Sequence, residues 1–131
     1  MGGNPGVYSK RWIGRENATT QQYIDFVLEK MKDVPQDQRG AQLRTVIALA
    51  IPFQDGPEKQ RVYSVSAKVA GIIPPKPSTY REDGFPYRSL LFIPAINKFY
   101  NHQEMTPQEE EKYNHRRKAL EELKKYIGTR I

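Results

Sequence analysis

The sequence predicts a mixed α/β fold, and four stretches of its 131 residues carry that prediction. Apolar residues recur at helical spacing in residues 20–33 and again in residues 106–128. Between them, residues 41–51 and 61–71 are rich in β-branched and aliphatic side chains, which is typical of strands. We therefore expect a sheet flanked by helices.

The bulk composition is typical of one soluble domain. The chain is 37% hydrophobic and 27% charged, and its length allows a single modest core. No apolar run approaches the roughly 18–20 residues that a membrane span needs, and the first residues lack the apolar segment of a signal peptide. Cysteine is absent, which excludes disulfides and cysteine-bound metal. We expect a single cytoplasmic domain over residues 1–131.

The net charge of +6 leaves two kinds of anionic partner open. The basic residues are spread along the chain without a long run of like charge. A requirement for solubility is therefore enough to explain the charge, and nucleic-acid binding is not needed to explain it. An anionic small ligand such as a nucleotide uses the same positive potential and needs far fewer residues. A basic nucleic-acid-binding domain remains an alternative.

The first helix and the strand pair have clear boundaries. Thr19 or Thr20 is expected to cap a helix that runs to about Asp33, because the Val34-Pro35 pair stops it. Residues 41–51 are interpreted as a buried strand, and residues 61–71 as its antiparallel partner, with residues 53–60 as the connection. The predicted inner residues are Ile24, Val27, Leu28 and Met31 on the helix, and Tyr63, Val65, Ala67 and Val69 on the second strand.

The second half contains a long loop, a short strand and a helix. The proline-rich residues 72–84 are too many for a tight turn and form a candidate functional loop, which leads to a strand at residues 89–93. Thr106 and Glu109 form a capping box for one helix over residues 106–128, with acids first and bases last. Its buried stripe is expected to contain Tyr113, Leu120, Leu123 and Ile127.

No common catalytic or metal-binding motif is present. The only histidines are His102, expected in a surface loop, and His115, and no Walker-type loop or G-x-S-x-G stretch occurs. The acidic residues 109–111 point in different directions on a helix, so they form a poor metal site. The residues alone therefore assign no catalytic group and no metal ligand.

Three segments occur in a recognisable order: GGNPGVYSKRWIG at residues 2–14, GFPYRSLLFIP at 84–94 and YNHRRKAL at 113–120. Together they resemble the inosine/xanthosine triphosphate pyrophosphatase family, which carries G-x-P-G-x-Y-S-x-R, then G-F-G-Y-D-P, then S-H-R-x-x-A-L. The resemblance covers nearly the whole chain. It implies an elongated fold on a long twisted mixed sheet flanked by helices, usually dimeric, of which this chain would be the C-terminal two-thirds.

The activity that the resemblance implies is hydrolysis of a nucleoside triphosphate to a monophosphate and diphosphate with Mg²⁺, which removes deaminated purine nucleotides. Phe85 would stack on the purine, Tyr87 would line the base pocket, and His115 and Arg116 would read the 6-oxo group. Fixed donors would reject adenine, because its amino group cannot accept their hydrogen bonds. Without the resemblance, His115-Arg116 is a solvated helix patch, and Phe85 and Tyr87 are aromatic anchors of a loop. Ser9 and Arg11 are candidates for phosphate contact.

Several positions depart from the family pattern. Arg88 stands where the family has Asp, Glu110 where it has Lys, and Asn114 where it has Ser, while Pro86 and Ser89 replace a Gly and a Pro. An acid and a base have therefore exchanged places. We hypothesise that Arg88 and Glu110 face each other across the base pocket, so that base recognition is altered and not simply lost.

The family's phosphate-binding T-x-N-x-x-K loop, its metal-binding Glu and the Asp that activates water match nothing in this chain. The catalytic residues and the Mg²⁺ ligands are therefore unknown. The chain is a fragment, a split half that needs a partner, or a member that has lost hydrolysis and serves as a nucleotide-binding or dimerisation module. The absent segment would supply strands, so we expect self-association that covers an open sheet edge by strand addition or exchange.

Overall fold

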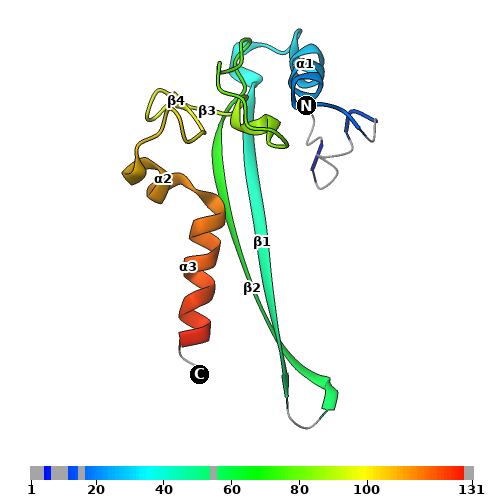
Figure 1. The fold of residues 1–131 in the computed structure, drawn as a ribbon, viewed down its shortest axis with the longest axis vertical. Helices are drawn as coiled ribbons and strands as arrows, with labels where there is room; N and C mark the ends of the chain where they lie inside the picture. The colour runs from blue at the N-terminus through cyan, green and yellow to red at the C-terminus, as the bar shows by residue number, and fades with distance from the viewer. Residues whose placement is uncertain (1–4, 7–11, 15–16, 54–55, 129–131) are drawn as a thin grey trace. The chain divides into compact units, whose positions relative to one another are not determined.

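A computed structural model of the chain describes residues 5–6, 12–14, 17–53 and 56–128. It contains three α-helices and a four-stranded sheet in that part of the chain, in the order β1-β2-β3-β4 (Figure 1), so the predicted α/β class is confirmed. The chain divides into two compact units. The first unit consists of Met1–Ala41 and Gly71–Met105, and the second consists of Gln42–Ala70 and Thr106–Ile131. No helix in these described ranges is both long and apolar enough to span a membrane.

Helix α1, Thr20–Met31, is the main core element of the first unit. Thr19 caps it, as its hydroxyl accepts from the Gln22 N–H at 3.1 Å while the Gln22 side chain accepts from the Thr19 N–H at 2.9 Å. The helix ends two positions before the predicted Asp33. Its buried side chains pack with Ile73 and Leu90, which lie in the second segment of the same unit. The side chains that α1 contributes to this cluster are Tyr23, Ile24, Val27 and Met31.

Arg39 joins the end of α1 to the start of the sheet, next to the 3-10 turn η2, Gln36–Gln38. Its side chain is only 4% exposed. The guanidinium donates to the Ile73 and Met31 carbonyl oxygens at 2.6 Å each, and to that of Val34 at 3.2 Å. A buried charge needs such partners, and these three carbonyl oxygens belong to the turn at the end of α1 and to the residue that follows β2.

Strands β1, Gly40–Phe53, and β2, Gly56–Ile72, form a long hairpin (Figure 1). The predicted connection over residues 53–60 is wrong, because both strands extend toward residues 54–55. The prediction of a buried first strand is also wrong: exposure alternates from Ala41 to Ala50, and Val46 is 63% exposed. The reason is that a pleated strand turns alternate side chains to opposite faces. The predicted inner face of β2 is confirmed, with Val69 buried.

The sheet continues with two short strands, β3, Phe92–Ile93, and β4, Lys98–Phe99, in antiparallel pairing. Ile72 of β2 pairs with Phe92, and a Cβ at the neighbouring Gly71 would collide with the Phe92 carbonyl oxygen. The predicted strand over residues 89–93 is shorter because the N–H groups of Leu90 and Leu91 donate back to the Tyr87 carbonyl.

The last predicted helix is two helices, α2, Pro107–Tyr113, and α3, His115–Gly128. The Thr106–Glu109 capping box is confirmed. Asn114 interrupts the helix with an extended backbone, φ −64° and ψ 108°. The restart at His115 changes which side chains are covered, so Leu120, predicted to be buried, is 50% exposed while Ala119 is fully buried.

Candidate functional site

The loop before β3 presents Phe85, Tyr87 and Arg88. Gly84 has a φ of +82°, a backbone conformation that favours glycine, and directs the chain into the 3-10 turn η3, Pro86–Arg88. The Phe85 N–H donates to the Glu82 carbonyl at 2.9 Å, and the Arg88 N–H donates to the Phe85 carbonyl at 3.2 Å. Phe85 is left 45% exposed. An exposed ring on a tightly turned loop can stack on a flat ligand.

Helix α1 holds this loop in place through side chains at its first turn. The Thr20 hydroxyl lies 3.2 Å from an Asp83 carboxylate oxygen, to which it donates, and it accepts from the Gly84 N–H at 2.9 Å. Arg81 donates from Nε to the Gln21 side-chain oxygen at 2.8 Å. The turn that carries Phe85 is thus anchored by residues about 60 positions earlier in the chain.

Tyr87 is built into the core at the base of the same loop. Its hydroxyl lies 3.2 Å from that of Tyr23, and the two rings meet edge to face at 5.8 Å between centroids. Burial raises the pKa of Tyr87 above its ordinary value, and the hydrogen bond to Tyr23 adds to this rise. Burial also raises the pKa of Tyr23, which the hydrogen bond to Tyr87 partly opposes. Both hydroxyls are therefore neutral near pH 7, and Tyr87 serves in part as a loop anchor.

A polar network lies on the C-terminal side of Arg88. Glu104 accepts from the Ser78 hydroxyl at 2.5 Å and from the Asn101 amide at 2.9 Å, and the same amide donates to the Arg88 carbonyl at 3.2 Å. Burial alone would raise the pKa of the Glu104 carboxyl, but the hydrogen bonds from Ser78, Asn101 and the Phe99 N–H, together with the charge of Lys98, outweigh it and lower the pKa. This carboxylate stays ionised and fixes the segment that follows the loop.

The Arg88 side chain is half-buried next to Tyr100. Its guanidinium lies 4.1 Å from the centre of the Tyr100 ring, and Nη1 donates to the Tyr100 carbonyl at 3.3 Å. Stacking of this kind restricts a long side chain to one direction. Arg88 is thus held by its own unit.

The junction of α2 and α3 presents Glu110, Asn114, His115 and Arg116. The Asn114 side chain accepts from the Arg117 N–H at 3.0 Å, as the N-cap of α3, and donates to Glu110 at 3.2 Å. His115 is 7% exposed, whereas Arg116 is exposed. The interpretation of the whole pair as a solvated patch therefore fails for His115 and describes Arg116 alone.

The predicted base-binding residues thus form two local groups, one in each unit. Residues 85–88 make up the first group and the α2–α3 junction the second. The expectation that Arg88 and Glu110 face each other stays a prediction, as does a role for either group in binding. Ser9 and Arg11 lie outside the described residues. His102 lies exposed in a turn, as predicted.

The acidic and histidine side chains are the groups that could bind a metal ion in this cysteine-free chain. In the described ranges, no three of them come together in a group that could hold a metal ion. The described residues therefore assign no ligand to the Mg²⁺ that the family resemblance implies.

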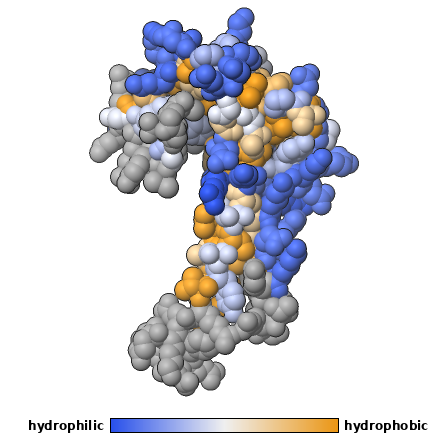
Figure 2. Space-filling model, turned by 180° about the vertical axis from the view of Figure 1, so that it is seen from behind, coloured by the Kyte–Doolittle hydropathy of each residue, from blue (hydrophilic) through white to orange (hydrophobic). Residues whose placement is uncertain are grey.

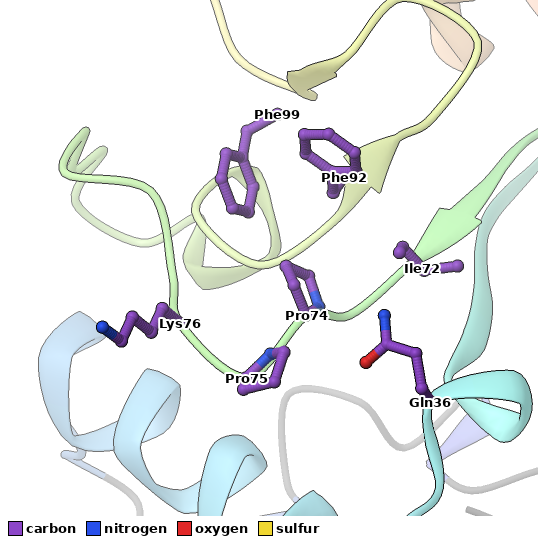
Figure 3. A pocket seen from close by; sticks show the side chains of 7 residues that line it. All are labelled: Gln36, Ile72, Pro74, Pro75, Lys76, Phe92 and Phe99. Atoms are coloured by element: carbon purple, nitrogen blue, oxygen red, sulfur yellow. The ribbon is translucent and has the colours of Figure 1, made fainter.

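An open apolar pocket of about 500 Å³ lies in the first unit (Figure 3). Phe92 and Phe99 meet edge to face at 5.3 Å between ring centroids, next to Pro74, while the Lys76 side chain points away from them (Figure 3). It shares no residue with either group above. With one amide, Gln36, on its lining and a lysine at its edge, this pocket has little to offer a triphosphate.

The sequence did not reveal three residues that shape the first group: Tyr23, Asn101 and Glu104. Tyr23 was visible only as a further aromatic on the apolar face of the first helix. Asn101 and Glu104 sit in a segment with no periodic pattern, and their partners lie up to 23 or 26 positions away. No local signal could have found them.

Comparison with known proteins shows which family the chain resembles over most of its length. The model of the Ham1 family matches residues 1–126. The chain is 38% identical to a dITP/XTP pyrophosphatase of Leuconostoc mesenteroides, covering 97% of this chain and 57% of that protein. For the enzyme of the same name from Bacillus subtilis the identity is 35%, over 97% of this chain and 59% of that one. The chain thus spans less than two thirds of these relatives.

Solved structures show the same likeness in three dimensions. A HAM1 protein from Coxiella burnetii superposes with a TM-score of 0.74 at 28% identity, covering 96% of this chain and 59% of that one. The Ham1 protein of Staphylococcus aureus gives a TM-score of 0.73 at 24% identity, over 98% and 60% of the two chains, which supports the fold alone.

Proposed function

Because the chain belongs to the Ham1 family, we propose that it carries the base-recognition part of a nucleoside triphosphate pyrophosphatase that acts on deaminated purine nucleotides such as inosine and xanthosine triphosphate. The reaction is hydrolysis of the triphosphate to a nucleoside monophosphate and diphosphate. The observation that carries the proposal is the match to dITP/XTP pyrophosphatases along 97% of this chain.

Base recognition is assigned to the two groups of residues described above. Phe85 is exposed on an anchored turn and offers a ring for the purine. His115 and Arg116 offer donors to the 6-oxo group that deamination creates. A 6-amino group would leave such donors unpaired, at a cost of about 1–3 kcal/mol for each buried donor. The proposal therefore predicts preference for inosine over adenosine nucleotides.

Further features complete the proposal. The family resemblance implies Mg²⁺ dependence and a dimer, and the absence of cysteine fits a cytoplasmic location. Mg²⁺ usually binds through one or two carboxylates together with the substrate phosphates, so its protein ligands remain to be assigned. Tyr87 is assigned to the wall of the base pocket, where the hydrogen bond between its hydroxyl and that of Tyr23 would hold the loop against α1.

The test compares binding of inosine and adenosine triphosphate by calorimetry and follows diphosphate release with Mg²⁺. Phe85→Ala and Arg116→Ala should each weaken inosine triphosphate binding by about tenfold, or about 1.4 kcal/mol. Arg117→Ala is the matched control, since Arg117 is an exposed neighbour paired with Glu121 at 3.4 Å, and it should bind normally. Equal affinity for both nucleotides would overturn the assignment of the base site.

The outcomes also separate the alternatives. Binding with release of diphosphate supports a pyrophosphatase. Binding without turnover supports a non-hydrolytic nucleotide-binding module instead. Salt-sensitive binding to long DNA or RNA, with no affinity for mononucleotides, would favour a nucleic-acid-binding domain.

The exchanged charges have a test of their own. Arg88→Asp and Glu110→Lys each leave two like charges in the proposed pocket, whereas the double variant restores the family's own arrangement. If the two residues face each other, each single variant should weaken nucleotide binding and the double variant should recover it. Additive losses in the double variant would contradict the hypothesis.

A further inference from the structure

Phe85 is the one large hydrophobic side chain that is clearly exposed among the described residues of the first unit. The other exposed large hydrophobic residues belong to the second unit, and they are Val46, Ile51, Val62 and Leu120. In that unit, apolar residues gather along the β1–β2 hairpin in the view of Figure 2. An exposed ring binds a flat ligand best when its direction is fixed in advance, because ordering a mobile side chain on binding costs free energy. The backbone that directs Phe85 therefore affects affinity.

The backbone in front of Phe85 is a β-turn over residues 82–85. It is closed by the bond from the Phe85 N–H to the Glu82 carbonyl at 2.9 Å. Gly84, in the third position, has a φ of +82°, which is typical of a type II turn. This bond uses neither polar group of the central peptide, between Asp83 and Gly84. Because glycine has the widest conformational freedom, one closing bond does not fix such a turn.

The Thr20 hydroxyl contacts both central residues of this turn. It accepts from the Gly84 N–H at 2.9 Å and donates to an Asp83 carboxylate oxygen at 3.2 Å. A hydroxyl has one hydrogen to donate and lone pairs to accept with, so it can make both bonds at once. Thr20 is half-buried and is the first residue of α1, whose buried side chains pack into the core of the same unit. It therefore offers the turn a rigid point of attachment.

The ends of the loop are joined by bonds that do not involve Thr20. The Ser78 N–H donates to the Ser89 carbonyl at 2.8 Å, and the Ser89 hydroxyl donates to the Tyr80 carbonyl at 2.5 Å. Loss of the Thr20 hydroxyl should therefore leave the loop closed and release only the turn in front of Phe85. A substitution at this position can thus test the direction of the ring without removing the loop.

We propose that Thr20 is a positioning residue for base binding, since its hydroxyl fixes the turn over residues 82–85 and so holds the Phe85 ring in the direction that receives the purine. The inference rests on the proposed function for the identity of the ligand. Thr20 acts through Phe85 and makes no contact with the base itself. Its neighbour Thr19 is exposed, and its side chain caps α1 through Gln22. The two adjacent threonines therefore have different roles.

The first experiment measures binding of inosine triphosphate by calorimetry. Thr20→Val replaces the hydroxyl with a methyl group of similar size and should weaken binding by about fivefold to tenfold, as expected for the loss of one or two hydrogen bonds. Thr20→Ser keeps the hydroxyl and should bind within about twofold of the unmodified chain. Thr19→Ala is the matched control, because it should lower the midpoint of thermal unfolding but leave binding unchanged. Unchanged binding in Thr20→Val, or equal weakening in Thr19→Ala, would overturn the inference.

The second experiment asks whether Thr20 acts through Phe85. In a chain that already carries Phe85→Ala, Thr20→Val should weaken binding no further, because the ring that it positions is absent. The double variant should therefore bind inosine triphosphate as Phe85→Ala does. Additive losses from the two substitutions would show that Thr20 affects binding by another route and would refute the inference.

The third experiment needs no ligand. Exchange of the Gly84 N–H with solvent, followed by nuclear magnetic resonance without nucleotide, should be about fivefold faster in Thr20→Val than in the unmodified chain, and nearly unchanged in Thr20→Ser. A chain that binds no inosine triphosphate would overturn the proposed function, and the exchange rate would still decide whether Thr20 fixes the turn. Equal exchange in Thr20→Val and the unmodified chain would refute the inference whether or not the nucleotide binds.

Discussion

Phe85 in the first unit and His115 in the second are held in different ways. The turn that carries Phe85 depends on partners distant in sequence: Thr20 and Asp83 are 63 positions apart, and Tyr23 and Tyr87 are 64 apart. The α2–α3 junction depends on neighbours, since Asn114 bonds to residues three and four positions away. The first arrangement requires the tertiary structure, whereas the cap at Asn114 is a local feature of the helix junction.

This difference decides how each group should respond to mutation. Long-range contacts are coupled, because the loss of one anchor loosens the others that it holds in place. Local caps contribute separately, and each is worth about 1 kcal/mol. Substitutions of coupled long-range partners in the first unit should therefore produce non-additive effects, and those at the α2–α3 junction additive ones.

The largest effect is expected at Arg39. Arg39→Met keeps the aliphatic part of the side chain but removes the donors to the carbonyls of Met31, Val34 and Ile73. Since a buried acceptor without a donor costs about 1–3 kcal/mol, we expect unfolding in urea to show a loss of about 3 kcal/mol. Arg44→Met, at an exposed position of β1, is the control and should change stability by less than about 0.5 kcal/mol. Equal effects at the two arginines would contradict the comparison.

The next effect concerns the two tyrosine hydroxyls of the first unit. Tyr23→Phe and Tyr87→Phe should each cost about 1 kcal/mol, because each leaves the other hydroxyl without this partner. The double variant should cost little more than either single one. Urea unfolding of all four proteins gives the coupling free energy, and additivity would show that the two hydroxyls act independently.

The same pair predicts a dependence on alkaline pH. Burial raises the pKa of both tyrosines above the ordinary value of 10.0. A group with a raised folded pKa contributes stability that is complete below its unfolded pKa and is lost as the pH rises above it. The free energy of unfolding should therefore fall above about pH 10. The Tyr23→Phe, Tyr87→Phe double variant should show a shallower fall, and an unchanged slope would contradict this assignment.

The same contrast explains what the sequence could predict. The capping boxes at Thr19 and Thr106 and the alternation in β2 depend on residues within a few positions, so pattern alone predicted them. Arg39, by contrast, looked like any surface arginine, because its three carbonyl partners come together only in the folded chain. The break at Asn114 has a local cause, but asparagine is tolerated inside helices as well as at their caps, so its presence did not decide between one helix and two.

A smaller effect is expected at the α2–α3 junction. Asn114→Ala removes the N-cap of α3 and should cost about 1 kcal/mol, whereas Asn114→Asp keeps an acceptor for the Arg117 N–H and should cost less. Thermal unfolding followed by circular dichroism measures both. Combined with Tyr87→Phe, Asn114→Ala should add to its effect within about 0.5 kcal/mol, because Tyr87 bonds to Tyr23 whereas Asn114 bonds to Glu110 and Arg117. Strong coupling between them would show that the two groups do not respond separately.

The smallest effect is expected at Glu104 and depends on pH. The hydrogen bonds from Ser78 and Asn101 lower the pKa of this carboxyl below its ordinary 4.5, despite burial. A group with a lowered folded pKa contributes stability above its unfolded pKa and loses it as the pH falls through the folded value. The free energy of unfolding should therefore decline below about pH 4.5.

Glu104→Gln should cost about 1 kcal/mol or less at neutral pH and should make that decline shallower, because glutamine does not titrate. Glu121→Gln, on the exposed face of α3, is the control and should leave the decline in stability at acid pH unchanged. If both variants show the same decline, the polar network beside Arg88 contributes no more to the pH dependence of stability than a surface carboxylate does. The contrast between the units would then rest on Arg39 and the tyrosine pair alone.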